Sequence, residues 1–338
     1  MAKPVKAIEL RTPYLIFSGD ESRLTYAKTG AGLVQWRGEL CTGQLRLENG
    51  IDLGIPDLTS REAAAAGVGS LIVGVAPVGG SIPNRWLPAL IEAAREGLDL
   101  VAGLHTKLSS IEPLVQAARE GNSSLVDVRV PPSDLPVASG KKRSGKRLLT
   151  VGTDCALGKK YTSLQLEKDL RAAGFDATFR ATGQTGIMIA GQGIPIDAVI
   201  ADFISGAAEL LSPDNSLNHW DVIEGQGGIF HPAYGQVSHG LLIGSQPDAF
   251  VVCHAAGREA ISGWEPMKLP SIGDVIKRTL DIGRLTNSKI RCIGISVNTA
   301  SLDSTVRGPY LAKLADRYGL PCVDPLVDGT TALINELR

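Results

Sequence analysis

A lysine pair ends a glycine-rich turn near the middle of the chain. Residues 151–163 read VGTDCALGKKYTS, and in this segment five residues separate Gly152 from Gly158, which is followed by Lys159 and Lys160. An apolar run precedes the turn and a helical pattern follows it. The backbone N–H groups of a helix start and a lysine side chain therefore meet at one place, which is typical of a loop that holds a diphosphate.

The residue after the first lysine separates this turn from the phosphate loop of a nucleotide hydrolase. In such a loop, a serine or threonine at this position binds Mg²⁺ between the phosphates. Lys160 stands in its place, and an ammonium group repels a metal ion instead of ligating it. Thr162 comes two residues later, about 200° further round a helix of 3.6 residues per turn, so it is a poor substitute. We predict a loop that holds the diphosphate of a cofactor such as coenzyme A, without a metal.

The turn also contains a cysteine close to the start of the predicted helix. Cys155 is near the two lysines in sequence, and a helix start with nearby cations lowers the pKa of a thiol. An acyl-cysteine intermediate is therefore one alternative, although small residues also occupy such loops for steric reasons. The predicted cofactor-binding residues are Gly152, Thr153, Asp154, Cys155, Gly158, Lys159, Lys160, Tyr161 and Thr162.

Three side chains are candidates for proton transfer. Glu224 ends an apolar strand before the glycine turn 225–228, and a carboxylate beside a diphosphate is expected to have a raised pKa; a structural pair with the lysines is the alternative. Asp202 lies in an apolar run, where burial would raise its pKa and make it the second candidate base, with capping or a pair with Arg180 as the alternative. His231 follows the glycine turn and can line the rim of the site.

Polar residues after two neighbouring strands are candidates for substrate binding. Arg180 ends one predicted strand and can form a bidentate clamp on a substrate carboxylate, although an ordinary surface arginine is the alternative. The N–H groups of the glycine turn can stabilise an oxyanion. The predicted substrate-binding residues are Arg180, Gln184, Thr185, Gly225 and Gln226.

Composition narrows the class of protein. The 338 residues include 34 Lys and Arg against 35 Asp and Glu, so no basic excess indicates binding to nucleic acid or to an anionic membrane. No apolar stretch approaches the roughly 18 residues of a membrane helix, and the charged start of the chain does not resemble a signal peptide. The five cysteines and five histidines lack metal-binding spacing. We predict a cytoplasmic protein with reduced thiols and small-molecule substrates.

Short apolar runs alternate with helical stretches, which predicts parallel βαβ units. Ligands of such sheets bind at the carboxyl ends of the strands. The predicted strands are 14–19, 70–76, 98–104, 125–130, 147–152, 177–182, 220–224, 249–254 and 290–297, and the predicted helices are 60–66, 84–96, 111–120, 159–173, 197–211, 272–285 and 303–318. Residues 136–146, basic and without periodicity, are predicted to be a solvated linker. It separates an N-terminal Rossmann-like α/β domain (1–135) from a C-terminal α/β domain (147–338) with a mostly parallel, P-loop NTPase-like sheet.

Several motifs together resemble a known family. The five-residue spacing of the turn is similar to the G-T-D-x-x-x-G-K loop of dethiobiotin synthetases, and EGQGG at 224–228 is similar to their E-G-x-G-G element. Over nearly its whole length the chain resembles the family, long catalogued as a domain of unknown function, that includes D-glutamate N-acetyltransferases of the DgcN type. The matching segments are Tyr26–Gly30, Gly152–Thr162, Arg180–Gly186, Ala201–Gly206 and Glu224–Gly228.

The resemblance implies an acyltransferase that uses acetyl-CoA as donor and D-glutamate as acceptor. An ATP-dependent ligase or kinase of the dethiobiotin synthetase type is the alternative, and a nucleotide-binding regulator without turnover is a third class. A homodimer is the default expectation for an enzyme of this size.

Overall fold

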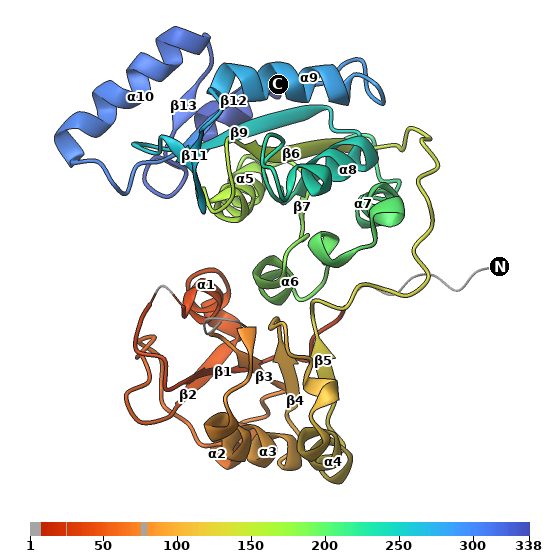
Figure 1. Ribbon diagram of the computed structural model, residues 1–338, viewed down its shortest axis with the longest axis vertical. Coiled ribbons are helices and arrows are strands. Elements are labelled where there is room, and N and C mark those ends of the chain that lie inside the picture. The colour runs from red at the N-terminus through yellow and green to blue at the C-terminus, as the bar shows by residue number, and fades with distance from the viewer. Residues whose placement is uncertain (1–7, 25, 76–79) are drawn as a thin grey trace. The chain divides into compact units, whose positions relative to one another are not determined.

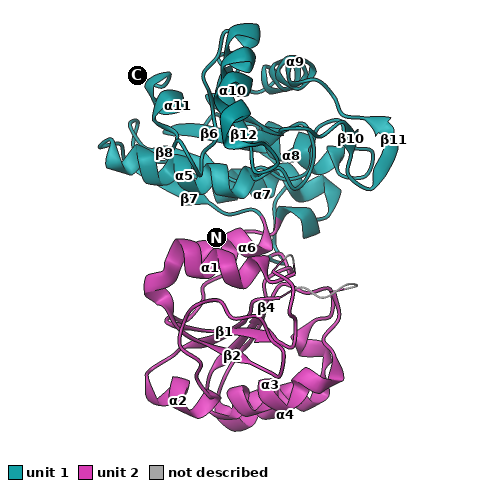
Figure 2. Ribbon diagram, turned by 90° about the vertical axis from the view of Figure 1, so that its left-hand side faces the viewer, with its two compact units in different colours: residues 1–5, 132–182, 196–338 teal, residues 6–131, 183–195 magenta. Residues whose placement is uncertain are grey.

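Two compact units make up the described part of the chain, which comprises residues 8–24, 26–75 and 80–338 of a computed structural model. The N-terminal unit holds the described residues up to Pro131 together with Gly183–Pro195, and the C-terminal unit holds Pro132–Thr182 and Ile196–Arg338 (Figure 2). The chain therefore returns to the first unit for thirteen residues. The predicted contiguous domains, 1–135 and 147–338, place this segment in the C-terminal domain. Its helix α6 (Gln184–Ala190) instead contacts α1 (Lys28–Arg37) of the N-terminal unit, a contact between distant parts of the sequence.

A parallel sheet with helices on both faces forms the N-terminal unit (Figure 1). Its strands are β1 (Tyr14–Gly19), β2 (Cys41–Arg46), β3 (Ser70–Val73), β4 (Asp99–Ala102) and β5 (Leu125–Asp127), in the order β2-β1-β3-β4-β5. Helices α2 (Ser60–Ala65), α3 (Leu87–Arg95) and α4 (Glu112–Gly121) lie on one face, and α1 (Lys28–Arg37) and α6 (Gln184–Ala190) on the other. All neighbouring strands are parallel, and this order is one of the two common doubly wound arrangements.

The C-terminal unit is built on a six-stranded parallel sheet in the order β13-β12-β9-β6-β8-β7. Its strands are β6 (Lys146–Gly152), β7 (Ala177–Arg180), β8 (Trp220–Ile223), β9 (Ala249–Ala255), β12 (Arg291–Asn298) and β13 (Cys322–Val323), and its helices are α5 (Lys159–Ala172), α7 (Ile204–Leu211), α8 (Gly235–Ser245), α9 (Ile272–Gly283), α10 (Ser304–Tyr318) and α11 (Thr331–Asn335). A separate antiparallel hairpin joins β10 (Ala260–Ile261) to β11 (Trp264–Lys268). The predicted α/β class with parallel sheets is confirmed.

The central strand β6 carries the predicted phosphate loop at its carboxyl end. After β6 the chain adds β7 and β8 on one side, and then β9, β12 and β13 on the other. Ligands of open parallel sheets bind where the strand order reverses in this way. Leu166 and Leu170 of α5 share a buried core with Leu148 of β6 and Val222 of β8, which fixes the helix behind the loop on one face of the sheet.

Helix α8 was not predicted, because it contains glycines that disfavour a helix. The same glycines allow it to approach α7 closely. A Cβ atom at Gly244 would lie 2.2 Å from the carbonyl oxygen of Ser205, and one at Gly240 would lie 2.5 Å from Cγ2 of Ile204. Close packing, which is a tertiary effect, therefore outweighs local propensity here.

Two local predictions are wrong. The helix predicted over 197–211 is two short 3₁₀ turns followed by α7, because Ile200 between the turns has an extended backbone. The end of the predicted linker is not fully solvated: the Arg143 guanidinium donates to the backbone carbonyl oxygens of Ser212 at 2.7 Å and Gly244 at 2.8 Å, and its side chain is only 10% exposed. Burial also lowers the pKa of Arg143 to about 10.

Among the described residues, every helix is too short or too polar to span a lipid bilayer.

Candidate active site

The loop between β6 and α5 leaves a helix start open to an anion. Gly158 has a φ of 100°, a left-handed conformation that strains residues with a side chain. It is the N-cap of α5, and no side chain caps this helix. The first N–H groups of a helix have no partner within the helix and lie at the positive end of its dipole. This helix start is therefore a candidate site for a diphosphate.

Lys159 is buried against the loop that it follows. Its Nζ donates a hydrogen bond to the carbonyl oxygen of Asp154 at 2.8 Å. The helix start can come this close to the turn after β8 because that turn begins with a glycine: a Cβ atom at Gly225 would lie 3.1 Å from Cδ of Lys159 and 1.7 Å from the carbonyl oxygen of Thr150. Burial lowers the pKa of Lys159. The thiols of Cys253 and Cys155 raise it and, less strongly, so do two carboxylates that include Glu224. A bound anion would supply the negative charge that a buried ammonium group requires.

The next residues of α5 have different surroundings. The Nζ of Lys160 lies 4.3 Å from the centroid of the Tyr161 ring, and burial raises the pKa of the Tyr161 phenol. The Thr162 hydroxyl is buried and hydrogen-bonds to the carbonyl oxygen of Gly158 and to the hydroxyl of Ser296 on β12. Thr162 thus supports the loop from the core side, and it does not replace the magnesium-binding hydroxyl of a nucleotide hydrolase.

Asp154 connects the loop to the segment after β9. Its carboxylate accepts hydrogen bonds from the backbone N–H groups of Cys155 at 2.7 Å and Ser262 at 2.9 Å, and from the guanidinium of Arg258 at 3.0 Å. Arg258 also donates to the carbonyl oxygen of Cys155 at 2.8 Å. Arg258 was not predicted as a site residue. Its position shortly after the carboxyl end of a strand is the one signal that could have indicated it.

Cys155, Asp154 and His231 form a cluster whose polar atoms lie within 4.8 Å of one another. The spacing of the sequence did not predict this cluster, because His231 is 76 residues away from Cys155. Burial raises the pKa of the Cys155 thiol, and the opposing effect of Lys159 is smaller. The expectation that the loop lowers this pKa is therefore wrong.

Other loop residues stabilise its conformation. The N–H of Thr153 donates to the carbonyl oxygen of Cys253 at 3.1 Å, and its hydroxyl shares a hydrogen bond of 3.2 Å with Nδ1 of His254. Burial lowers the pKa of His254. A Cβ atom at Gly152 would lie 3.2 Å from the carbonyl oxygen of Asp154, so a glycine fits the tight turn.

Glu224 lies at the carboxyl end of β8 and is only 4% exposed. Its Oε2 accepts a hydrogen bond from the N–H of Thr182 at 2.9 Å, and the Thr182 hydroxyl donates to the Glu224 carbonyl oxygen at 2.7 Å. Side chains alternate along a strand, so Glu224 points to the same face as Val222, which packs with α5. The acid and Lys159 therefore share one side of the sheet.

Two family models match most of this chain. A P-loop domain described as a domain of unknown function, DUF1611_C, matches residues 136–334. A Rossmann-like domain with the corresponding description, DUF1611_N, matches residues 43–131. The chain belongs to the DUF1611 family. The family resemblance and the two-domain fold inferred from the motifs are confirmed.

Two relatives of this DUF1611 chain carry the name D-glutamate N-acetyltransferase. One, from Pseudoalteromonas sp, is 45% identical over 98% of this chain and 100% of its own. The other, from Tritonibacter scottomollicae, is 44% identical over 97% of this chain and 99% of its own. A crystal structure of a DUF1611 family protein from Anabaena variabilis, at 2.30 Å resolution, covers 97% of this chain and 99% of that chain with a TM-score of 0.86 and 32% identity.

Arg180 of the DUF1611 chain forms an ion pair with a buried acid. Its Nε donates to the buried carboxylate of Asp221 at 2.7 Å, and Asp221 is three residues before Glu224, which directly follows the end of β8. An odd spacing on a strand places the two side chains on opposite faces. The clamp of Arg180 on a substrate carboxylate stays a prediction. It requires the guanidinium to bind the substrate in addition to Asp221, or in place of it.

The other predicted contacts are divided between the two units. Asp202 is exposed in a 3₁₀ turn, so the burial expected for a second base is not present. Gln226 is near Glu224 and donates from Nε2 to the Thr182 hydroxyl at 3.0 Å. Gln184 and Thr185 begin α6 of the N-terminal unit, where the Thr185 hydroxyl bonds to that of Thr29 at 2.9 Å.

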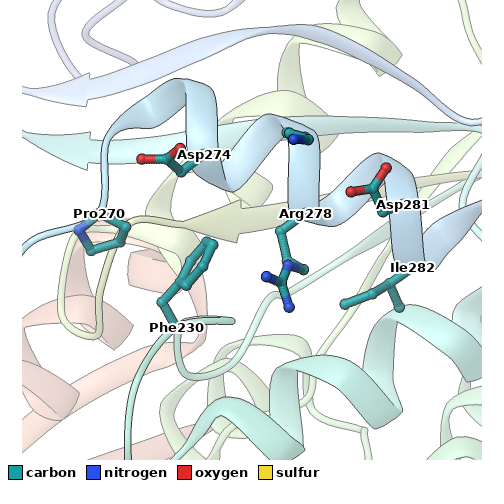
Figure 3. A pocket seen from close by; sticks show the side chains of 7 residues that line it. Phe230, Pro270, Asp274, Arg278, Asp281 and Ile282 are labelled. Atoms are coloured by element: carbon teal, nitrogen blue, oxygen red, sulfur yellow. The ribbon is translucent and has the colours of Figure 1, made fainter.

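A surface cavity of about 610 Å³ lies between the loop after β8 and helix α9 (Figure 3). The guanidinium of Arg278 points toward Phe230, and its Cζ lies 5.3 Å from the centroid of that ring. The side chains that line the cavity belong to Phe230, Pro270, Asp274, Lys277, Arg278, Asp281 and Ile282. The two carboxylates in this lining balance the two cations. The cavity therefore lacks the positive charge expected of a second anion site.

Proposed function

We propose that this chain transfers the acetyl group of acetyl-CoA to the amine of D-glutamate, giving N-acetyl-D-glutamate and free coenzyme A. The observation that carries the proposal is the full-length similarity, at 44 to 45% identity, to two relatives named D-glutamate N-acetyltransferase. The uncapped start of α5 and the buried Lys159 support a donor with a diphosphate. Lys160 in place of a magnesium ligand supports coenzyme A over a nucleotide triphosphate.

Direct transfer requires a base, an oxyanion site and a leaving thiolate. In our proposal Glu224 removes a proton from the ammonium group of the substrate, and the free amine attacks the thioester carbonyl. A C–N bond forms, and the carbonyl oxygen becomes negative in the tetrahedral state. The N–H of Gly225 already donates to the Thr150 hydroxyl at 2.9 Å, so the N–H groups of residues 226–228 stabilise that oxygen. The C–S bond then breaks and the thiolate leaves with the electron pair. The second proton of the nitrogen passes to this thiolate and gives the free thiol of coenzyme A, and Glu224 releases the first proton to solvent.

The test is product formation by the purified chain. Incubation with acetyl-CoA and D-glutamate is expected to release free thiol in step with N-acetyl-D-glutamate, measured by a thiol reagent and by mass spectrometry. L-glutamate serves as the matched control for chirality. The alternative ligase or kinase would instead release ADP from ATP and Mg²⁺ in the presence of substrate, and ADP release without thiol release would overturn the proposal.

Cys155→Ser is expected to retain kcat within about threefold of the parent protein, because a thiol whose pKa is raised by burial is a weak nucleophile. Serine preserves the size of the side chain in a tight loop. Steady-state kinetics with acetyl-CoA and D-glutamate measure this, and quenched samples analysed by intact mass report any acetylated enzyme. Loss of turnover in the variant, together with an acetyl adduct on the parent protein, would show an acyl-cysteine intermediate.

We also propose a cytoplasmic homodimer that requires no metal and binds neither nucleic acid nor membrane. The five cysteines are free, which suits a reducing compartment. The balanced charge gives no general attraction to polyanions. Light scattering after size exclusion tests the oligomeric state, and activity after exhaustive dialysis against a chelator tests the metal.

A further inference from the structure

The ring of His231 is held in one orientation by three neighbours. It is buried and stacks on the ring of Tyr234 with 4.5 Å between centroids. The edge of Trp264, from the hairpin that β10 and β11 form, meets it at 4.7 Å and an interplanar angle of 80°. The backbone N–H of Ala233 donates to its Nδ1 at 3.1 Å. The ring plane and the identity of each nitrogen are therefore fixed.

The bond from Ala233 also fixes the tautomer. Because Nδ1 accepts a hydrogen bond, the proton of the neutral ring is on Nε2. Nε2 faces the phosphate loop and lies 3.9 Å from Oδ1 of Asp154, which is too long for a hydrogen bond. That oxygen already accepts the N–H of Cys155. Within the described part of the chain no acceptor takes the Nε2 proton, so a donor points into the loop.

This arrangement does not suit the two usual functions of a histidine in such a cluster. A general base needs a lone pair on the nitrogen that faces the substrate, and here that nitrogen carries the proton. A histidine that binds a metal through Nε2 carries its proton on Nδ1. Here Nδ1 cannot carry a proton, because it accepts the hydrogen bond from the N–H of Ala233. His231 is instead suited to donate a hydrogen bond.

We propose that the Nε2–H group of His231 donates to the carbonyl oxygen of the acyl group and stabilises the charge that this oxygen acquires during transfer. The inference rests on the proposed function and assigns an electrophilic role within the same site. A phosphate oxygen is a poorer acceptor here, because its permanent charge would be repelled by the Asp154 carboxylate, whose Oδ1 lies 3.9 Å from Nε2. A carbonyl oxygen is neutral in the ground state, and Arg258 partly neutralises the carboxylate.

Substitutions of His231 separate a donor from a base. A glutamine presents an amide N–H close to the position of Nε2 and cannot act as a base, whereas asparagine is too short to reach it. We expect His231→Ala and His231→Asn to lower kcat by about tenfold, as for the loss of one neutral hydrogen bond, and His231→Gln to recover most of it. His239→Gln, at an exposed histidine of α8, is the matched control and should not change kcat.

Two outcomes of this series would overturn the inference. If the glutamine variant is as slow as the alanine variant, and the acid limb of the kcat profile against pH is lost in both, His231 is a base. If only KM for acetyl-CoA rises and kcat is unchanged, His231 binds the phosphates. Turnover by the parent protein tests the proposed function separately, so the two failures are distinguishable.

A second measurement does not depend on activity. Long-range ¹H–¹⁵N NMR of the parent protein at neutral pH reports which ring nitrogen carries the proton. We expect the Nε2–H tautomer for His231, and selective loss of its signals in His231→Gln assigns them. A proton on Nδ1, or a shift of both nitrogens on addition of Zn²⁺, would contradict the donor assignment.

Discussion

Glu224→Gln is expected to lower kcat by roughly a hundredfold or more, because a positioned general base typically contributes about 10² to 10⁴ to the rate. The substituted amide oxygen can still accept the hydrogen bond from the N–H of Thr182, so the end of β8 should keep its conformation. KM for acetyl-CoA should stay close to that of the parent protein. Steady-state kinetics over a range of pH measure both quantities, and the thermal midpoint tests the fold.

The matched control is Asp202→Asn, since Asp202 was the second candidate base. Its side chain is exposed in a 3₁₀ turn, so its replacement should leave kcat unchanged within about twofold, as surface substitutions usually do. The reverse pattern, with Asp202→Asn slow and Glu224→Gln active, would move the base to Asp202. A fall in thermal stability of Glu224→Gln without a fall in kcat would show that Glu224 has only a structural role.

The phosphate loop could be predicted because its chemistry is local. Gly158, Lys159 and the following helix are consecutive in sequence, and the apolar run before them defines β6. The strands that end near the loop could be predicted as well, because each is a short apolar run of consecutive residues. The glycines of α8 locally disfavour a helix, although they allow α8 to pack closely against a neighbouring helix. That neighbour is not visible in a local sequence pattern, so α8 could not be predicted from one.

The partners within the site could not be predicted from spacing. Arg258 reaches Asp154 across 104 residues, and His231 reaches the same loop only because the turn after β8 lies beside that of β6. Arg180 shows the converse: its place at a strand end is as predicted, yet its side chain is engaged by Asp221 on the other face from Glu224. The direction of a side chain depends on its position along the strand. A shift of one residue moves the side chain to the other face of the sheet.

Lys159→Ala is expected to lower kcat/KM for acetyl-CoA by about a hundredfold, mainly through a rise of at least about tenfold in KM, because a hydrogen bond to a charged group contributes about 1.5 to 3 kcal/mol. The Nζ of Lys159 is buried at the uncapped start of α5, where no solvent replaces it. KM for D-glutamate should not change. Initial rates at saturating D-glutamate, with calorimetric titration of coenzyme A, measure the effect.

The neighbouring lysine provides the matched control. Lys160 is half-buried with its Nζ over the ring of Tyr161, so Lys160→Ala should raise KM for acetyl-CoA by only about threefold, the effect of a partly screened charge. An unchanged KM in Lys159→Ala would place the donor elsewhere in the molecule. Equal effects of both substitutions would show that the loop attracts the diphosphate by net charge alone, whereas a larger effect at Lys159 requires a specific contact, as the burial of its Nζ against the loop predicts.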